Sequence, residues 1–253
     1  MAKKKYDLIF PIGEACSCSS TLRHADLQIQ SFPFDWLFGS DFLGRINILL
    51  NNFENLIRLE DIECTGDNGI PSHLCDIYTN RVNGIGFNHD FLHGADVEKE
   101  IVTVAAKYQR RAERLLNKAN SSEKILAVWV DSPGSRWFAK DNELFVEGQK
   151  LLQEKFPKAQ VDLLVFIWDK GRPIKDVLTE QVNEHITKYT FDYQFHHKKK
   201  VVADYVVDEK MLMKFLKNYE LNMTTQEKIQ NLIHKNEDKP IKKFVLNLIL
   251  KFV

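Results

Sequence analysis

The sequence has no excess of charge of either sign and no long apolar run. Its 253 residues include 35 Lys and Arg against 35 Asp and Glu, so the formal net charge is zero. A general nucleic-acid binder usually shows a basic excess, and the balance argues against that class of protein. No uninterrupted apolar stretch approaches the roughly 20 residues that span a bilayer. We therefore expect no transmembrane helix and no nucleic-acid partner.

Cysteine is scarce, and signals of secretion are missing. The apolar stretch after the lysines at residues 3–5 is too short for the core of a signal peptide. Cysteines in a long chain without such a signal indicate free thiols in a reducing compartment, so we expect a cytoplasmic location. The four cysteines are Cys16, Cys18, Cys64 and Cys75.

Two apolar runs indicate a parallel sheet. Residues 125–132 and 161–169 have the length and near-continuous apolar character of buried strands, and residues 144–156 between them have helical character. Strand, helix and strand in this order are typical of a parallel βαβ unit. We therefore predict an α/β fold with a mainly parallel sheet flanked by helices.

Other elements follow from periodicity and turn residues. Asp96 is expected to cap a long polar helix that ends near Asn120. Gly, Asn and Asp dominate residues 65–72 and 81–94, where we expect mainly loops. Further strands are expected at residues 6–12, 188–196 and 201–207, and further helices at residues 19–27 and 41–58.

No internal repeat or low-complexity linker divides the chain. We expect one α/β catalytic-type domain over residues 1–207, with a helical C-terminal extension over residues 208–253 packed on it. The extension ends in KPIKKFVLNLILKFV, whose apolar residues cover most of a helix circumference. Docking on the core is one interpretation of this helix. Peripheral contact with a membrane surface or a partner is the other, because lysines flank the apolar set.

The stretch GEACSCSS is the first candidate site. Cys16 follows the first predicted strand and Gly13, where the N-terminus of a helix would direct free backbone N–H groups at its sulfur. Those donors and the helix dipole favour a thiolate and stabilise an oxyanion, which is why we consider Cys16 a nucleophile. An inert buried cysteine is the alternative. The same role is open to Cys18, Ser17 and Ser19, and the alternative for the serine hydroxyls is to cap the helix.

A cysteine nucleophile needs a base, and His89 in NHDFLHG is the candidate. Asp90 is a poor choice for orienting its own neighbour, because adjacent side chains diverge on a strand. A loop histidine bound to the backbone is the alternative for His89. His89 and His93 have helical spacing, but glycines nearby argue against a helix and no third ligand shows a recognisable spacing. We therefore expect no metal and no cofactor.

Several carboxylates and arginines are further candidates for functional residues. Asp35 lies among aromatic residues in SFPFDWLFG, where it either caps the next helix or orients a catalytic histidine. Asp131 follows a predicted strand, and open α/β sheets bind ligands at the carboxyl ends of their strands. No Walker lysine or G-x-G-x-x-G pattern accompanies it, so no nucleotide site is predicted. Three arginines of the long polar helix either bind phosphate or acidic glycan groups or form a solvated face: Arg110, Arg111 and Arg114.

Three stretches together resemble a bacterial family of unknown function that is grouped with papain-like cysteine peptidases. They are YDLIFPIGEAC, SFPFDWLF and GFNHDF, followed by a helix with KYQRRAERLL. The likeness covers roughly residues 5–170, and Pro-Phe-Asp-Trp with the later His-Asp-Phe is its specific part. By position, it implies Cys16 as the cysteine and His89 as the histidine of the family site. Gln30 stands where the family pattern has an arginine.

The resemblance implies a cysteine-dependent hydrolase. Cys16 would attack an ester, amide or thioester of a small-molecule, glycan or peptide substrate, with His89 as base. The acid that orients His89 stays open between Asp35, Asp90 and Asp131. The residues expected to bind substrate are Gly13, Ser17, Trp36 and Asp131.

Both the predicted fold and the predicted reaction have an alternative. A buried parallel strand does not normally precede a papain-type nucleophile, so we favour a three-layer sheet similar to SGNH or Rossmann-like proteins over an α+β papain-like fold. Members of the family resemble proteins encoded near surface-polysaccharide genes, which suits an acyltransferase or esterase that acts on a glycan. A non-catalytic domain that binds a glycan or a nucleotide sugar is the third possibility.

Overall fold

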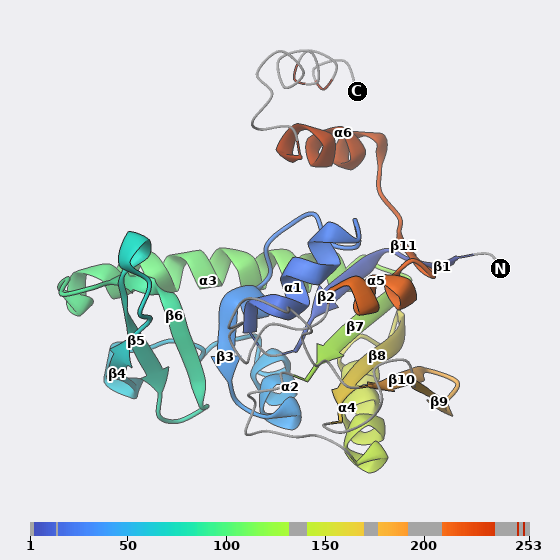
Figure 1. The fold of residues 1–253 in the computed structure, drawn as a ribbon, viewed down its shortest axis with the longest axis horizontal. Helices are drawn as coiled ribbons and strands as arrows, with labels where there is room; N and C mark the ends of the chain where they lie inside the picture. The colour runs from blue at the N-terminus through green and yellow to red at the C-terminus, as the bar shows by residue number, and fades with distance from the viewer. Residues whose placement is uncertain are drawn as a thin grey trace, which may run out of the picture.

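A five-stranded, mainly parallel sheet forms the centre of the fold (Figure 1). The computed structural model describes residues 3–13, 15–131, 141–169, 177–191 and 209–235, together with Asn247 and Leu250. The first four strands of the sheet run parallel to one another, and the last is antiparallel to its neighbour. In spatial order the strands are β2 (Leu8–Pro11), β7 (Lys124–Val130), β8 (Gln160–Trp168), β10 (Ile186–Phe191) and β9 (Leu178–Asn183).

Helices pack on both faces of this sheet, because strands β2, β7 and β8 are buried on both sides. One apolar cluster joins Trp129 and Val165 to residues of α2, α3 and α4, which span Phe42–Leu50, Val97–Asn120 and Asn142–Lys155. A second cluster joins Val128 and Phe166 to residues of α1 and α5, which span Ala15–His24 and Glu209–Leu216. The predicted α/β class is confirmed.

A second, antiparallel sheet lies beside the N-terminal half of α3 (Figure 1). Its strands, in spatial order, are β3 (Leu37–Gly39), β6 (Ile85–Leu92), β5 (Cys75–Asn80) and β4 (Ile62–Asp67). The prediction of loops over residues 65–72 and 81–94 is therefore wrong where β4 and β6 run through them. Its cause is visible in β4, where only the first of six residues is buried and no alternation marks the strand. Three short 3-10 helices are η1 (Pro33–Trp36), η2 (Leu59–Asp61) and η3 (Pro71–His73).

The predicted βαβ unit and long helix are confirmed. Strand β7 pairs with β8 in parallel, with Val128 opposite Leu164, and α4 connects the two. Asp96 caps α3, its side chain accepting a hydrogen bond from the backbone N–H of Glu98 at 3.1 Å. The strand predicted at residues 188–196 is β10, which begins at Ile186. The strand predicted at residues 201–207 lies outside the described residues.

The C-terminal region contains a strand as well as helices. Strand β11 (Tyr219–Leu221) pairs in parallel with β1 (Lys4–Tyr6). The extension over residues 208–253 is therefore not wholly helical, in contrast to the prediction. Helix α6 (Thr225–His234) follows β11. In the part of the chain that is described, no helix is both long and apolar enough to cross a membrane. The apolar segment at the C-terminus lies almost entirely outside that part.

Candidate active site

The turn after β2 brings Cys16 to the carboxyl end of the parallel sheet. Gly13 packs against the end of β7, where a Cβ atom on Gly13 would lie 2.4 Å from the backbone nitrogen of Val130. Only glycine fits this close approach. Because α1 begins at Ala15, Cys16 is in its first turn, where backbone N–H groups have no partner within the helix.

Arg45, on the buried side of α2, holds this turn in place. Its side chain is fully buried and donates to four backbone carbonyl groups. These link the turn before Cys16 to strand β3. The acceptors are the oxygens of Ile12 (3.3 Å), Gly13 (3.2 Å), Leu37 (3.0 Å) and Gly39 (2.8 and 3.0 Å).

The two thiols at this turn have different surroundings. Cys18 is fully buried against the sheet, with its Sγ 3.6 Å from the carbonyl oxygen of Val128, and burial raises its pKa to about 12. Cys16 is half-buried. Burial also raises the pKa of the Cys16 thiol, although its own backbone N–H acts in the opposite direction. Cys16 is thus the more accessible sulfur, and as a neutral thiol it needs a base.

Asp35 is fully buried and binds α1 and the segment that follows it. Its carboxylate accepts hydrogen bonds from Arg23 Nη2 at 2.7 Å and from Gln28 Nε2 at 2.8 and 3.0 Å. Its carbonyl oxygen accepts a bond of 2.8 Å from Ser19 Oγ. Burial raises the pKa of the Asp35 carboxyl, and Arg23 and Gln28 oppose that rise. The N-cap of α2 is Asp41, so the capping role predicted for Asp35 is wrong; orientation of a histidine stays a prediction.

His89 lies in β6 where the strand bulges. Between the last pair of partners before the bulge and the first pair after it, β5 advances two residues and β6 advances four. Bulges of this kind often redirect side chains at functional sites. Burial is the main cause that lowers the pKa of His89; the charge of Lys107 acts in the same direction, and that of Asp90 opposes it. His89 is therefore a neutral imidazole near pH 7, the form in which it accepts a proton.

The carboxylate next to His89 is held by α3. Asp90 accepts a hydrogen bond of 2.8 Å from the Tyr108 hydroxyl and forms an ion pair with Lys107. Burial raises the pKa of Tyr108, and the charges of Asp90 and Asp35 add to the rise, so both carboxylates lie near this tyrosine. Across the described residues, no hydrogen bond or ion pair joins Cys16 to His89. Their pairing stays a prediction.

The residues predicted to bind substrate lie around the same turn or on η1. Asp131 is fully buried and directly follows Val130, against which Gly13 packs. The hydroxyl of Ser17 is buried and has no hydrogen-bond partner among the described residues. Trp36 is half-buried at the end of η1. Their roles in binding stay predictions.

Comparison with known proteins decides the family. Residues 7–171 match the family described as "Putative papain-like cysteine peptidase (DUF1796)". The matched region is 165 of 253 residues and includes both Cys16 and His89. The chain belongs to this family. The family membership predicted from the motifs is confirmed, and no curated protein or solved structure matches the chain.

The family region holds three side chains at the site that sequence reasoning did not assign. Arg45 supports the turn before Cys16, and Lys107 and Tyr108 hold Asp90. For Arg45 a signal existed, because a single charge in the apolar stripe of a helix needs buried acceptors. Lys107 and Tyr108 belong to the motif KYQRRAERLL, but nothing in the sequence indicates that this helix packs on β6.

Proposed function

We propose that this member of the family is a cysteine-nucleophile hydrolase, in which Cys16 attacks the carbonyl carbon of an ester, amide or thioester and His89 is the general base. One observation carries the proposal: Cys16 lies in the first turn of a helix that follows a parallel strand, and it is the more accessible of the two thiols there. Membership in a family grouped with papain-like cysteine peptidases supports the same chemistry.

The directions in which the two pKa values shift favour general-base catalysis over a pre-formed ion pair of thiolate and imidazolium. The pKa of Cys16 is raised and that of His89 is lowered, so both groups are neutral near pH 7. As the sulfur bonds to the carbonyl carbon, His89 takes the thiol proton and the carbonyl oxygen becomes an oxyanion. The free backbone N–H groups at the start of α1 are suitable donors for that oxyanion.

The remaining steps return the enzyme to its starting state. The bond between the carbonyl carbon and the leaving group breaks, and the His89 imidazolium gives its proton to the departing alcohol, amine or thiol. Water, losing a proton to His89, then hydrolyses the thioester on Cys16 and restores the thiol. Asp90, whose charge favours protonated His89, would stabilise the imidazolium in both steps.

The layered sheet supports acyl transfer as a second candidate. A parallel sheet with helices on both faces and a nucleophile in the turn after a strand is similar to SGNH esterases and acyltransferases. With a glycan hydroxyl in place of water, the same thioester would pass its acyl group to a surface polysaccharide. For either reaction we propose a cytoplasmic location, because all four cysteines are free thiols.

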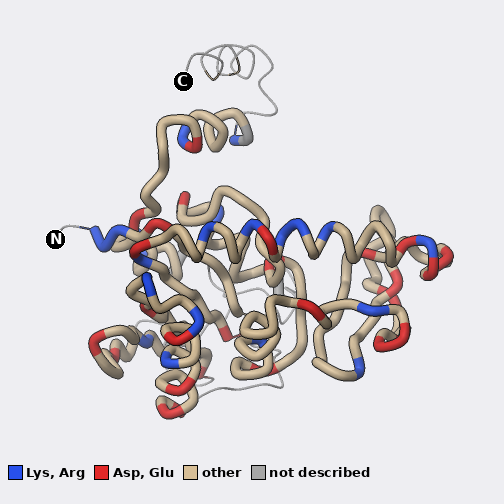
Figure 2. Tube along the Cα trace, turned by 180° about the vertical axis from the view of Figure 1, so that it is seen from behind, with Lys and Arg blue, Asp and Glu red and all other residues tan. Residues whose placement is uncertain are grey.

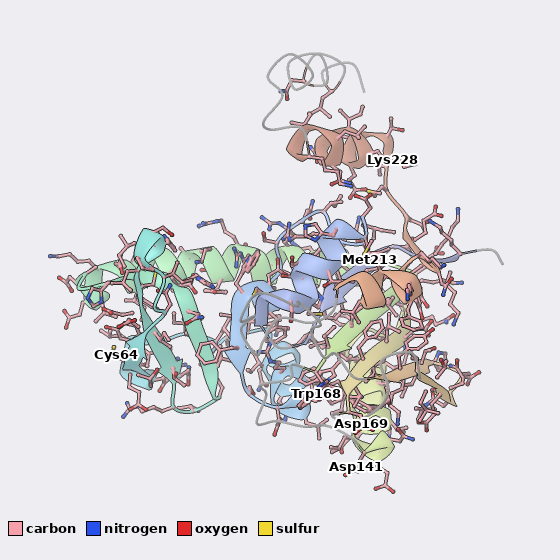
Figure 3. The ribbon with its side chains drawn as sticks, in the orientation of Figure 1. Cys64, Asp141, Trp168, Asp169, Met213 and Lys228 are labelled. Atoms are coloured by element: carbon pink, nitrogen blue, oxygen red, sulfur yellow. The ribbon has the colours of Figure 1, made fainter. Side chains whose placement is uncertain are left out.

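Alkylation with iodoacetamide tests the proposed nucleophile and base. Exposed Cys64 lies on edge strand β4, away from α1 (Figure 3), and gives the rate of an unassisted thiol. We expect Cys16 to react about tenfold faster than Cys64 at pH 7, despite its burial, and His89→Ala to slow Cys16 by about tenfold or more. Mass spectrometry of the labelled peptides measures each rate.

His93 provides the matched control. It directly follows β6 and pairs with Asp76 at 2.7 Å. His93→Ala therefore removes an imidazole from the same part of the chain and should leave the Cys16 rate unchanged. If Cys16 reacts no faster than Cys64 and is insensitive to His89→Ala, the enzyme proposal is wrong and a non-catalytic binding domain is the better account.

A further inference from the structure

Cationic side chains of α1 and α3 lie near η1, which contacts both helices. Helix α1 contributes Arg23, which binds Asp35 at 2.7 Å, and α3 contributes Lys107, which pairs with Asp90. Arg111 of α3 places its guanidinium 5.4 Å from the ring centroid of Tyr108. Figure 2 shows Lys and Arg in several bands along this helix.

Hydrogen bonds to one residue bring the two helices together. Arg23 Nη2 donates to the hydroxyl of Ser31 at 3.1 Å, and Arg114 Nη1 donates to the carbonyl oxygen of Ser31 at 2.7 Å. Arg114 and Arg111 are one helical turn apart on α3. The guanidinium groups of α1 and α3 thus meet at the segment that leads into η1.

The cluster has more positive than negative charge and leaves donors unused. Asp35 and Asp90 pair with Arg23 and Lys107, whereas Arg111 has no ion-pair partner within the described residues. Arg111 Nη1 and Arg23 Nε are both buried without a hydrogen-bond acceptor in that same part of the chain. Buried charged donors without acceptors are rare and costly, and they often indicate a missing ligand.

The cluster lies next to the proposed reacting groups. Cys16 and Arg23 are seven residues apart on α1, which places them on one helix face at roughly 10 Å. Ser19, on the same face, binds the backbone of Asp35 in η1. On the other side, Lys107 binds Asp90, the neighbour of His89. A substrate bound at Cys16 would therefore extend toward these cations.

We propose that Arg23, Lys107 and Arg111 form a binding site for an oxyanion of the substrate, a carboxylate or a phosphate group, so that the acyl compound attacked by Cys16 is anionic. This inference rests on the proposed function and specifies its substrate class. Guanidinium groups bind two oxygens of such groups at once, and an ammonium adds a third donor. The side chains of Arg23 and Lys107 are 23% and 32% exposed, so solutes reach the cluster.

The test compares iodoacetate with iodoacetamide at Cys16. The two reagents have the same leaving group and nearly the same size, and they differ in charge. We expect Arg111→Gln to lower the ratio of the iodoacetate rate to the iodoacetamide rate by about two- to fourfold at low ionic strength. Arg110→Gln is the matched control, because this exposed neighbour makes the same change of charge on another side of α3 and should leave the ratio unchanged.

A second measurement uses the unaltered protein and identifies the anion. At constant ionic strength, millimolar inorganic phosphate or acetate should slow the iodoacetate reaction at Cys16 but not at Cys64. Protection by phosphate alone indicates that the site binds a phosphate group. Protection by acetate indicates that it binds a carboxylate. No protection by either, together with equal ratios in both arginine variants, overturns the oxyanion site. Insensitivity of the iodoacetamide rate to His89→Ala overturns the proposed function instead, so the two failures are distinguishable.

Discussion

The Cys16→Ala protein is expected to hydrolyse p-nitrophenyl acetate at least about a thousandfold more slowly than the unaltered protein, at a rate close to that without enzyme. Loss of a covalent nucleophile removes the pathway through the acyl intermediate, and such losses reach this size or more in other hydrolases. Release of p-nitrophenol measures the rate. Mass spectrometry should find the acetyl group on the peptide that contains Cys16.

One control variant and one measurement of stability separate this outcome from simpler causes. Cys64→Ala removes the exposed thiol, which esters also acylate slowly, and should retain the full rate. Thermal unfolding of Cys16→Ala should match that of the unaltered protein, because the side chain is only half-buried and shortening it leaves little cavity. Full hydrolysis by a well-folded Cys16→Ala protein would exclude Cys16 as the nucleophile.

Arg45→Met is expected to lower the free energy of unfolding by about 3–5 kcal/mol, because several buried carbonyl groups lose a charged donor and each unsatisfied group costs about 1–3 kcal/mol. Methionine fills much of the volume but cannot donate, so the carbonyl oxygens of Ile12, Gly13, Leu37 and Gly39 would lose their buried partner. Each unsatisfied oxygen has its own cost. Urea unfolding followed by circular dichroism measures the loss.

The loss is expected because one guanidinium group reaches several acceptors at once. Arg45→Lys should therefore also be strongly destabilised. A single ammonium group cannot reach acceptors on both the turn before Cys16 and strand β3. Arg110→Met, at an exposed position of α3, should change the free energy of unfolding by less than about 0.5 kcal/mol. If Arg45→Met proves as stable as Arg110→Met, Arg45 does not hold the turn.

The parallel sheet was predictable because its signal is local. Buried strands of a parallel sheet are apolar on both faces, so β7 and β8 stand out as continuous apolar runs without any knowledge of their neighbours. The cap of α3 at Asp96 was also predictable, since a capping side chain binds the backbone only a few residues away.

The second sheet was not predictable in the same way. Strand β4 is nearly all exposed, and the glycines and asparagines that its turns require dominate the composition of the region. His89 therefore appeared to lie in a loop, whereas it lies in the bulge of β6. The register that produces the bulge depends on pairing with β5.

The surroundings of the candidate site depend on contacts between distant segments. Motifs selected Cys16, His89 and Asp35, but Asp35 binds Arg23 and Gln28, a pairing that becomes visible only when η1 packs on α1. Local capping rules predicted a different partner for Asp35, because they do not include tertiary packing.

The dependence of Cys16 alkylation on pH tests the central claim, that His89 takes the proton of the Cys16 thiol. Because the pKa of His89 is lowered and that of Cys16 is raised, the assisted reaction with iodoacetamide should stay nearly constant between pH 7 and pH 8. In His89→Ala, the rate should instead rise about tenfold per pH unit over the same range, as expected for a thiol that reacts only as thiolate. A tenfold rise per pH unit in both proteins, at equal rates, would contradict the account.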